Sequence, residues 1–499
     1  MKERKRNILL VEPGFRTKFP PMGLMKISTY HKRLGDNVKF VKGIKKTEAY
    51  SVYYDRIYIS TLFTYNWAIT INTINYYKTL VDNDPTRIKV GGIMASLMPE
   101  DVHFETGIEP TTGLLNKPDP FNDGNDIIID TLVPDYNLFD KAQQQTRLFG
   151  EKPPKLDYSY TLVDDSYFGY STKGCIRKCD FCGVPRLEPK YQAYLDIKPY
   201  VKTIKEEFGE KCHLVLFDNN ILASQKFPEI VRDIRDLGFE KGSVFEYINQ
   251  GNQTSRKNRY VDFNQGVDAR IMVEREDKVA LLGNVAINPL RVAFDHISEK
   301  DIYTKAIKLA AKYKIRDLSN YILYNWDDTP EDLWKRLKLN IDLNKEMDLK
   351  IYSFPMKYIP LNAKDRGSYI SPNWTFYLIR GVQRILNVLK GSVMTTEDFF
   401  FRAFGKNEIE FMDILHMPEA ILLYRDKKPW WLEKKWFSKF RDLKECGMDK
   451  DLLNILNSCK TTKEFENAIV KTKSGKLKSI LEMYLLTTTE VKELKSNIN

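Results

Sequence analysis

Short apolar runs alternate with helix-like stretches over the first part of the chain. Apolar residues at helical spacing extend from Pro20 to Leu34 and again up to about Leu80. This alternation predicts a doubly wound, Rossmann-like parallel sheet, and such sheets bind ligands at the carboxyl ends of their strands. The runs with the length and composition of buried strands are Asn7–Glu12, Asn37–Val41, Arg56–Ser60 and Arg87–Val90.

A second alternation of strand and helix begins near residue 166, after a stretch over 105–165 that is rich in Pro, Gly, Asp and Asn. Six such units predict a partial (β/α)6 barrel, with functional residues at the carboxyl ends of its strands. The polar and basic segment Gly238–Arg259 is expected to be an insertion loop. The strand-like runs are Tyr167–Ser171, Leu214–Phe217, Tyr260–Asn264, Arg291–Phe294, Asn320–Leu323 and Lys350–Phe354.

The last part of the chain is helical in pattern, with apolar residues at helical spacing over 408–423 and 452–469. The tryptophans in this region, Trp430, Trp431 and Trp436, are expected to pack rather than to stack on bases. The chain is therefore predicted to be an α/β protein in four parts. These are a doubly wound domain over 1–140, a linker over 141–165, a partial barrel over 166–365 and a helical C-terminal domain over 366–499.

Composition and charge restrict the class of protein. Hydrophobic residues make up 42% of the 499 residues, which is ample for buried cores and argues against a disordered chain. The net charge of +11 favours polyanionic partners such as nucleic acid, but it is spread along the chain, and a lysine-rich solvated surface is the preferred interpretation. The apolar run Ile8–Val11 is too short for a signal segment or a membrane span, so we expect a cytoplasmic protein with no membrane partner.

Three of the six cysteines form a cluster, Gly174-Cys175-Ile-Arg-Lys-Cys179-Asp-Phe-Cys182, directly after a predicted strand. Thiolates hold iron–sulfur clusters, and these spacings let one loop wrap a single cluster. Three ligands leave one iron open for a cosubstrate. A zinc knuckle is the alternative, but zinc sites generally have a second Cys/His doublet, which the sequence lacks. The remaining cysteines are expected to be small buried apolar residues: Cys212, Cys446 and Cys459.

The spacing C-x3-C-x2-C, with aromatic Phe181 before the last cysteine, resembles the signature of the radical S-adenosylmethionine (SAM) superfamily. The resemblance implies a [4Fe–4S] cluster on the three cysteines, with SAM bound to the fourth iron. It also implies cleavage of SAM to a 5′-deoxyadenosyl radical that abstracts hydrogen from the substrate, and an electron donor such as flavodoxin or ferredoxin. Later segments resemble the superfamily's strand ends in the same order: Leu216–Leu222, Gly266–Arg270, Arg291–His296 and Tyr321–Asp332.

The same resemblance implies which polar side chains contact SAM. Carboxylates suit the ribose hydroxyls, and a guanidinium group suits the SAM carboxylate. Asn325 stands where relatives usually have a glycine, so a side chain occupies space that glycine leaves open. The implied positions are Asp218, Asn219 or Asn220 for the amino group, Asp268 or Asp295 for the ribose, Arg270 or Arg291 for the carboxylate, and Phe181 and Asn325 as further cofactor contacts.

The first domain contains the segments Pro20–Met25, Leu34–Val38, Ile59–Tyr65, Val90–Ser96 and Pro134–Tyr136. These segments resemble parts of the cobalamin (B12)-binding domain that is fused to many radical SAM enzymes. In classical cobalamin domains a D-x-H-x-x-G loop supplies the lower histidine ligand, but here the loop Pro13–Pro20 contains no histidine. His31 lies inside a predicted helix and is expected to pack or to be exposed. Two alternatives remain: the domain binds cobalamin, or it keeps the fold without the cofactor.

Three functional hypotheses follow. The preferred one is a radical SAM enzyme that functionalises a C–H bond, methyl transfer being one option, on a small molecule, a peptide or a nucleic acid. The second is a nucleic-acid-binding or redox-sensing protein with a structural iron–sulfur cluster, which the basic charge and the segment 238–259 favour. The third is a zinc-knuckle protein. The first is preferred because only it needs the strand-end segments in their observed order.

Overall fold

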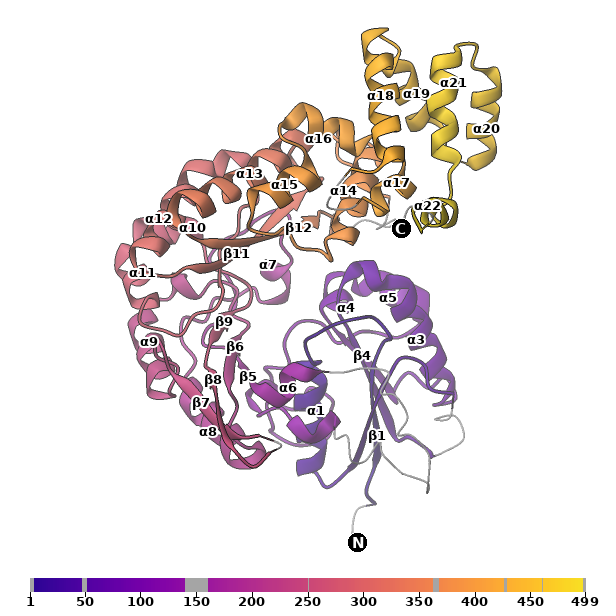
Figure 1. Cartoon of the computed structure of the whole chain (residues 1–499). Helices are drawn as coiled ribbons and strands as arrows, with labels where there is room; N and C mark the ends of the chain where they lie inside the picture. The colour runs from indigo at the N-terminus through magenta and orange to yellow at the C-terminus, as the bar shows by residue number, and fades with distance from the viewer. Residues whose placement is uncertain are drawn as a thin grey trace. The chain divides into compact units, whose positions relative to one another are not determined.

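The computed structural model describes residues 4–46, 52–139, 160–249, 251–361, 368–425, 429–459 and 461–496. The chain forms two compact units, which are described separately below (Figure 1). The first contains Met1–Val267, Ala280–Asn288 and Ile359–Gly367, and the second contains Asp268–Val279, Pro289–Tyr358 and Ser368–Asn499. Most of the predicted linker over 141–165 lies outside the described residues, and the predicted domain boundaries stay predictions.

The N-terminal strands form one parallel sheet in the order β2-β1-β3-β4, which confirms the predicted doubly wound fold. The chain moves from β1 to one neighbour and then crosses to the other, so the sheet has a switch point between β1 and β3. The strands are β1 (Asn7–Glu12), β2 (Asn37–Lys42), β3 (Arg56–Thr61) and β4 (Ile88–Gly92), and the helices are α1 (Met22–Arg33), α3 (Trp67–Thr79), α4 (Ile93–Leu97) and α5 (Pro99–Thr106).

Helices cover both faces of this sheet (Figure 1). Side chains alternate between the faces along each strand, so Ile57 and Tyr58 of β3 point to opposite sides. Ile57 packs in one core with Ile74 of α3. Tyr58 faces α1, where its hydroxyl lies 2.9 Å from Nε2 of His31. The alternation of the strands therefore separates two layers of helices, as the sequence predicts.

His31 is completely buried between Asp36 and Tyr58, which settles its place as a packing residue. Its Nδ1 atom lies 2.8 Å from Oδ2 of Asp36. Burial lowers the pKa of His31 to about 4, even though Asp36 favours the charged imidazole. The folded protein thus holds this histidine in its neutral form throughout the physiological pH range.

This histidine is expected to make the fold sensitive to mild acid. Between pH 6.5 and 4 the unfolded chain binds a proton at His31 that the folded chain does not, so stability rises with pH there and is lost on acidification. From pH 7 to pH 5 the loss should be about 2 kcal/mol from this group. Urea unfolding of wild type and His31→Gln at both pH values measures it. Equal pH dependence of the two proteins would contradict the prediction.

The first unit also contains the first half of the predicted barrel strands. β5 (Ser166–Gly169), β6 (His213–Leu216) and β9 (Val261–Phe263) form a parallel sheet in that order. Their carboxyl ends are in register, because Gly169 pairs with Leu216 and Leu216 pairs with Phe263. The connecting helices are α8 (Ile197–Phe208) and α9 (Phe227–Asp236), and the short helices α6 (Thr161–Asp165) and α7 (Val184–Leu187) flank β5.

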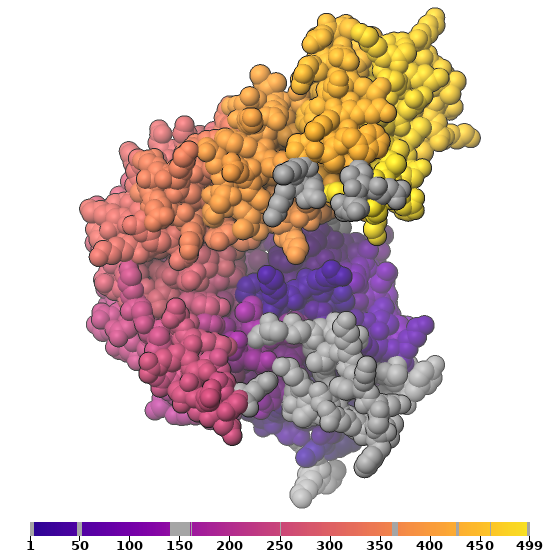
Figure 2. Space-filling model, viewed as in Figure 1, coloured from indigo at the N-terminus to yellow at the C-terminus, as the bar shows by residue number. Residues whose placement is uncertain are grey.

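The segment Gly238–Arg259 is not the loop that the sequence predicts. It forms an antiparallel hairpin of β7 (Val244–Ile248) and β8 (Thr254–Asn258). Side chains alternate along β7, where Val244, Glu246 and Ile248 are exposed and the residues between them are half-buried. The polar composition of the segment hid the two-residue period of a strand. Glu246, for example, is polar because it points outward, where it pairs with Arg256. In Figure 2 this pink-red segment lies at the molecular surface.

The second unit contains the other three predicted strands as a parallel sheet in the order β10-β11-β12. These are β10 (Leu290–Arg291), β11 (Asp317–Tyr324) and β12 (Lys350–Lys357). All six predicted strands therefore exist, three in each unit, and their closure into one barrel stays a prediction. Helices α10 (Ala269–Glu274), α12 (Lys300–Lys312) and α13 (Pro330–Met347) belong to this unit, and α11 (Glu276–Leu282) joins the two.

The C-terminal part of the second unit is helical, as predicted. One apolar core runs through it and includes Trp436, which is fully buried. Trp430 packs against this core, whereas Trp431 is 46% exposed, so the packing prediction is wrong for Trp431.

Across the described ranges, no helix has both the length and the apolar composition that a membrane crossing needs. The helices are α14 (Phe376–Val388), α15 (Glu397–Phe404), α16 (Glu408–Leu415), α17 (Glu419–Leu423), α18 (Trp431–Glu445), α19 (Asp449–Ser458), α20 (Thr462–Lys471), α21 (Gly475–Leu481) and α22 (Thr488–Ser496).

Candidate functional site

The clustered cysteines lie on the loop between β5 and α7. None of the six cysteines, all of which lie in the described ranges, forms a disulfide, and Cys175, Cys179 and Cys182 are each half-buried. A tight turn brings two of them together in the chain, since the backbone N–H of Cys182 donates to the carbonyl of Cys179 at 3.0 Å. The three thiols therefore share one loop at the carboxyl end of a parallel strand, as predicted.

The remaining cysteines do not resemble this group. Cys212 is buried and Cys459 is half-buried, but Cys446 is exposed, so the expectation of a buried residue is wrong there. Cys446 caps the carboxyl end of α18, where the chain leaves the helix at the surface. Its sulfur accepts a hydrogen bond from Nζ of Lys476 at 3.2 Å.

Backbone geometry holds the start of the cysteine loop. Gly174 has a φ of +73°, and a Cβ atom there would lie 2.7 Å from the carbonyl oxygen of Lys190. Its N–H donates to Oε2 of Glu188 at 2.6 Å. The same carboxylate oxygen accepts from Nδ2 of Asn219 at 2.8 Å. Glu188 thus ties the loop to the chain that follows β6, and the residue before the first cysteine has to be glycine.

Replacing Gly174 by alanine is expected to displace this loop. The left-handed backbone costs an L-residue roughly 1–2 kcal/mol, and the contact with Lys190 adds to that cost. Gly238 is a matched control, because its φ is +85° but no atom lies within 4 Å of its missing Cβ. Gly174→Ala should lower bound iron after anaerobic reconstitution, whereas Gly238→Ala should lower thermal stability only. Equal iron content in the two variants would show that the predicted displacement does not occur.

Asp218 lies beneath the cysteine loop and is fully buried. Its carboxylate accepts hydrogen bonds from the backbone and side chain of both Ser171 and Thr172, including 2.8 Å from Oγ of Ser171 and 2.6 Å from Oγ1 of Thr172. Burial raises the pKa of Asp218 to about 6, against the effect of these donors, so the carboxyl is ionised at neutral pH. The structure thus places Asp218 as a support that joins the chain after β5 to the chain after β6.

Asn220 is the predicted SAM contact that lies against a cysteine. Its Nδ2 atom donates to Sγ of Cys175 at 3.5 Å. Its Oδ1 atom is buried and has no hydrogen-bond partner among the described residues. The hydroxyl of Tyr191 donates to its backbone carbonyl at 3.3 Å and holds the turn. An unpaired buried acceptor beside a thiol is costly unless a ligand supplies the donor.

The predicted site residues Asp268, Arg270 and Asp295 belong to the second unit. Asp268 caps α10, and its carboxylate pairs with Arg270 at 2.9 Å. Arg270 also lies 3.8 Å from Glu299. Burial raises the pKa of Asp295 to about 7, with a further contribution from Glu299 that Arg336 and Arg270 oppose. Charged groups therefore gather here, with the Arg270 guanidinium between two carboxylates.

Asn325 and Arg291 both contact protein groups in the second unit. Asn325 is fully buried with a φ of +64°. Its amide donates to the carbonyls of Tyr358 and Tyr369 and accepts from the N–H of Ser371. Each polar atom of that amide thus holds the chain that follows β12. Arg291 donates from Nη1 to Oγ of Ser319 at 3.3 Å.

Sequence patterns did not identify the residues that build the cysteine loop. Glu188 accepts a hydrogen bond from Gly174, and the hydroxyls of Ser171 and Thr172 donate to Asp218. None of these three residues belongs to a motif of fixed spacing. The available signal is positional: two hydroxyl residues stand between a strand and a Gly-Cys pair. Phe181 is half-buried within the loop, between Cys179 and Cys182 in the chain.

The donor set fits a thiolate-bound cluster. Three thiols stand on one loop, the amide of Asn220 lies against the first of them, and Oδ1 of that amide is buried without a partner among the described residues. These are the groups that such a cluster and an amino-bearing cosubstrate would need. Within the described part of the chain, no three His, Cys, Asp or Glu side chains converge closely enough to hold a single metal ion. A [4Fe–4S] cluster does not need such convergence, because each cysteine would bind a different iron atom of the cluster.

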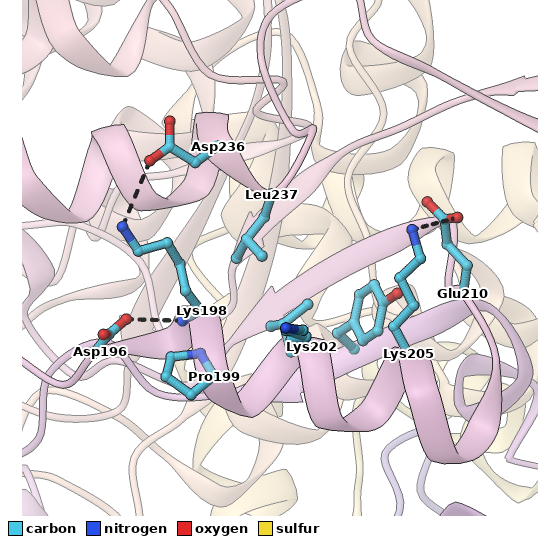
Figure 3. Close-up of a pocket in the computed structure, with 10 residues that line it drawn as sticks. Asp196, Lys198, Pro199, Lys202, Lys205, Glu210, Asp236 and Leu237 are labelled. Atoms are coloured by element: carbon cyan, nitrogen blue, oxygen red, sulfur yellow. Dashed lines mark hydrogen bonds and ion pairs between the residues drawn. The ribbon is translucent and has the colours of Figure 1, made fainter.

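Two other surfaces of the first unit hold charges that are already paired. A cavity of about 590 Å³ lies between α8 and α9, where Lys198 pairs with Asp236 and Lys205 pairs with Glu210 (Figure 3). No predicted site residue lines it. The basic residues of the hairpin are likewise paired, Arg256 with Glu246, Arg259 with Glu210 and Lys257 with Asp165. The hairpin therefore offers a polyanion little uncompensated charge.

An apolar patch lies at the carboxyl edge of the N-terminal sheet. Phe63 and Tyr65 follow β3, are 45% and 62% exposed, and stack with ring centroids 5.0 Å apart. Ile93 follows β4 and is also exposed. Gly14 follows β1, and a Cβ atom there would touch Ile69 at 3.4 Å. Apolar groups thus surround the switch point between β1 and β3, the place where sheets of this type bind ligands.

No family model matches this chain, and no curated protein matches it. Several solved structures are similar to it, of which two are described here. One is a radical S-adenosylmethionine methyltransferase, TsrM, from Kitasatospora setae with cobalamin and a [4Fe-4S] cluster bound, at 14% identity and a TM-score of 0.46 over 71% of this chain and 75% of that chain. The other is the same enzyme with tryptophan substrate and the SAM analogue aza-SAM, at 15% identity and a TM-score of 0.46 over 71% and 73%. A likeness at this identity does not establish a function.

Proposed function

We propose that this chain is a radical SAM enzyme that carries a [4Fe–4S] cluster on Cys175, Cys179 and Cys182. The supporting observation is the loop itself: three half-buried thiols that form no disulfide follow a parallel strand, and the amide of Asn220 lies against the first of them. Such a position, at the carboxyl end of a strand, is where α/β folds place their chemistry. The reaction would be C–H functionalisation, with methyl transfer as one form.

The chain's own residues would bind and orient the cosubstrate. When bound, the cluster would supply the electron that cleaves SAM, which is chemistry no side chain provides. The orphaned Oδ1 atom of Asn220 would accept a hydrogen bond from the SAM amino group. Asp218 and Glu188 would keep the loop in place through the contacts described above, and Tyr191 would hold the turn that carries Asn220. A reduced donor such as flavodoxin or ferredoxin would deliver electrons.

Production of 5′-deoxyadenosine tests the proposed function. The full chain would be purified and reconstituted without oxygen, and its iron and sulfide content measured. Addition of SAM and dithionite should release 5′-deoxyadenosine, which liquid chromatography detects. Samples without reductant should release none. An intact cluster that yields no 5′-deoxyadenosine with SAM and reductant would overturn the proposal, and bound zinc in place of iron would favour the zinc-knuckle hypothesis.

We further propose that the apolar patch at the carboxyl edge of the N-terminal sheet binds cobalamin. A corrin ring is large and flat, and the stacked rings of Phe63 and Tyr65 offer a flat apolar surface at the switch point. The loop after β1 has no histidine, so the lower face of the ring would have no histidine ligand from it. Methyl transfer would be the reaction that uses this cofactor.

Alanine at Phe63 and Tyr65 should weaken cobalamin binding about 10-fold or more, because the ring would lose two stacked apolar contacts. Titration of the anaerobic protein with hydroxocobalamin, followed by absorbance, measures the affinity. Phe104→Ala is the matched control, since Phe104 is 87% exposed on α5 and its loss should leave the affinity unchanged. If wild type retains no cobalamin, the domain keeps the fold without the cofactor.

A further inference from the structure

Two lysines and one aspartate form a buried charge cluster in the first unit, which we call the lysine triad: Lys26, Asp130 and Lys173. Lys26 lies on α1, Asp130 on the short helix η2 (Ile129–Thr131) and Lys173 two residues before Cys175. Both lysines are less than a tenth exposed. The triad therefore connects the N-terminal sheet's helix layer to the start of the cysteine loop.

Asp130 alone receives both ammonium groups. Nζ of Lys26 lies 3.5 Å from Oδ1 of Asp130 and donates to its backbone carbonyl at 2.5 Å. Nζ of Lys173 pairs with Oδ2 of the same carboxylate. Among the residues that the structure describes, no other carboxylate lies within 4 Å of either ammonium group. The triad thus carries one excess positive charge.

Aromatic rings border this charge. Nζ of Lys173 lies 5.1 Å from the ring centroid of Tyr170, and Nζ of Lys26 lies 6.0 Å from that of Tyr200. Burial lowers the pKa of Lys26 to about 8, so the amine still carries its proton at pH 7. A buried charge is screened much less by salt than an exposed one, and its field reaches neighbouring groups.

A buried positive charge without an anionic partner destabilises the folded protein, and a nearby anion removes this cost. A cluster on three thiolates carries net negative charge, and that charge grows when the cluster accepts an electron. We propose that the lysine triad is the electrostatic complement of the cluster and raises its reduction potential, which rests on the function proposed above. Its lysines are positioning residues, because they hold charge beside the loop and need not touch the reacting atoms.

Charge changes of opposite sign provide the test. Lys26→Met removes the excess positive charge and should shift the cluster's midpoint potential to a more negative value. Asp130→Asn adds positive charge and should shift the potential to a more positive value. EPR-monitored titration of anaerobic full-length protein at pH 7 without SAM measures both shifts. A merely structural role of the triad would not give shifts of opposite sign.

The same helix offers a matched control. Lys32 also lies on α1 and pairs with Asp135 at 2.6 Å, but its side chain is 49% exposed. Lys32→Met changes the net charge as Lys26→Met does, and it should leave the potential unchanged. The shift in Lys26→Met should also persist at high salt, because the triad is buried.

Iron content separates the possible failures. Equal potentials in wild type and Lys26→Met, with iron content intact, would overturn the role of the triad and leave the proposed function standing. Wild type that binds no iron would overturn both. If Asp130→Asn loses the cluster, comparison of Lys26→Met with Lys26→Arg decides, since arginine keeps the charge and should keep the wild-type potential. Equal potentials in those two variants would also reject the proposal.

Discussion

Replacing Cys175, Cys179 or Cys182 by alanine is expected to abolish both the brown colour and the formation of 5′-deoxyadenosine. Wild type should bind about four irons per chain after reconstitution, and each variant should bind far fewer. The turnover should fall by more than about 100-fold. Loss of a residue that only hydrogen-bonds a metal ligand already lowers metal affinity or activity about 10- to 100-fold. Iron analysis, absorbance spectra and product chromatography on the same samples measure the three quantities together.

Cys446→Ala is the control for this series. That thiol is also free, but it lies at the exposed end of α18, so its loss should change neither iron content nor turnover. A variant of the cysteine loop that keeps its full iron content would refute the assignment of that residue as a ligand. Loss of iron in Cys446→Ala as well would point instead to general destabilisation of the protein.

Arg336→Met should destabilise the second unit by about 3–5 kcal/mol, the usual cost of breaking a buried ion pair. Arg336 is fully buried on α13, and its Nη2 lies 2.6 Å from Oδ2 of Asp328. The guanidinium also donates to the carbonyls of Phe294, Asp295 and Leu323 at the carboxyl ends of β10 and β11. Methionine fills similar volume, but these carbonyls lose the guanidinium donor and the Asp328 carboxylate loses its cation, keeping, among the described residues, only its hydrogen bonds from Trp326 and Trp374. Thermal and urea unfolding measure the loss.

An exposed ion pair is the control for this change. Arg275 pairs with Asp277 at 2.7 Å, and both side chains are more than half exposed. Arg275→Met should therefore cost at most about 1 kcal/mol. The double variant Arg336→Met with Asp328→Asn should lose less than the sum of the single losses, because the second change removes the unpaired charge. Strict additivity would show that the two groups do not act as a pair.

The candidate site was predictable to the extent that it is local in the chain. Cys175, Cys179 and Cys182 are close in sequence, and any loop after β5 keeps their thiols together. Asn220 could also be expected near them, because parallel strands bring the chain after β5 and the chain after β6 to the same edge. The sequence positions of Asp218 and Asn220 did not show that the two side chains have different roles. Asp218 turned out to be enclosed by hydroxyl and backbone donors, whereas the neighbouring Asn220 keeps an unpaired acceptor.

The sequence by itself determined most of the strands and helices and their order, because hydrophobic period and strand-ending glycines are local properties. The hairpin of β7 and β8 is the exception, since its polar composition hid the strand period. It also determined that three thiols share a loop. Only the tertiary structure decided which distant groups meet. Lys26 and Lys173 converge on Asp130, and Glu188 closes the loop on Gly174, through contacts between residues far apart or outside any repeated spacing. Such pairings depend on side-chain packing and burial, which no periodic pattern records.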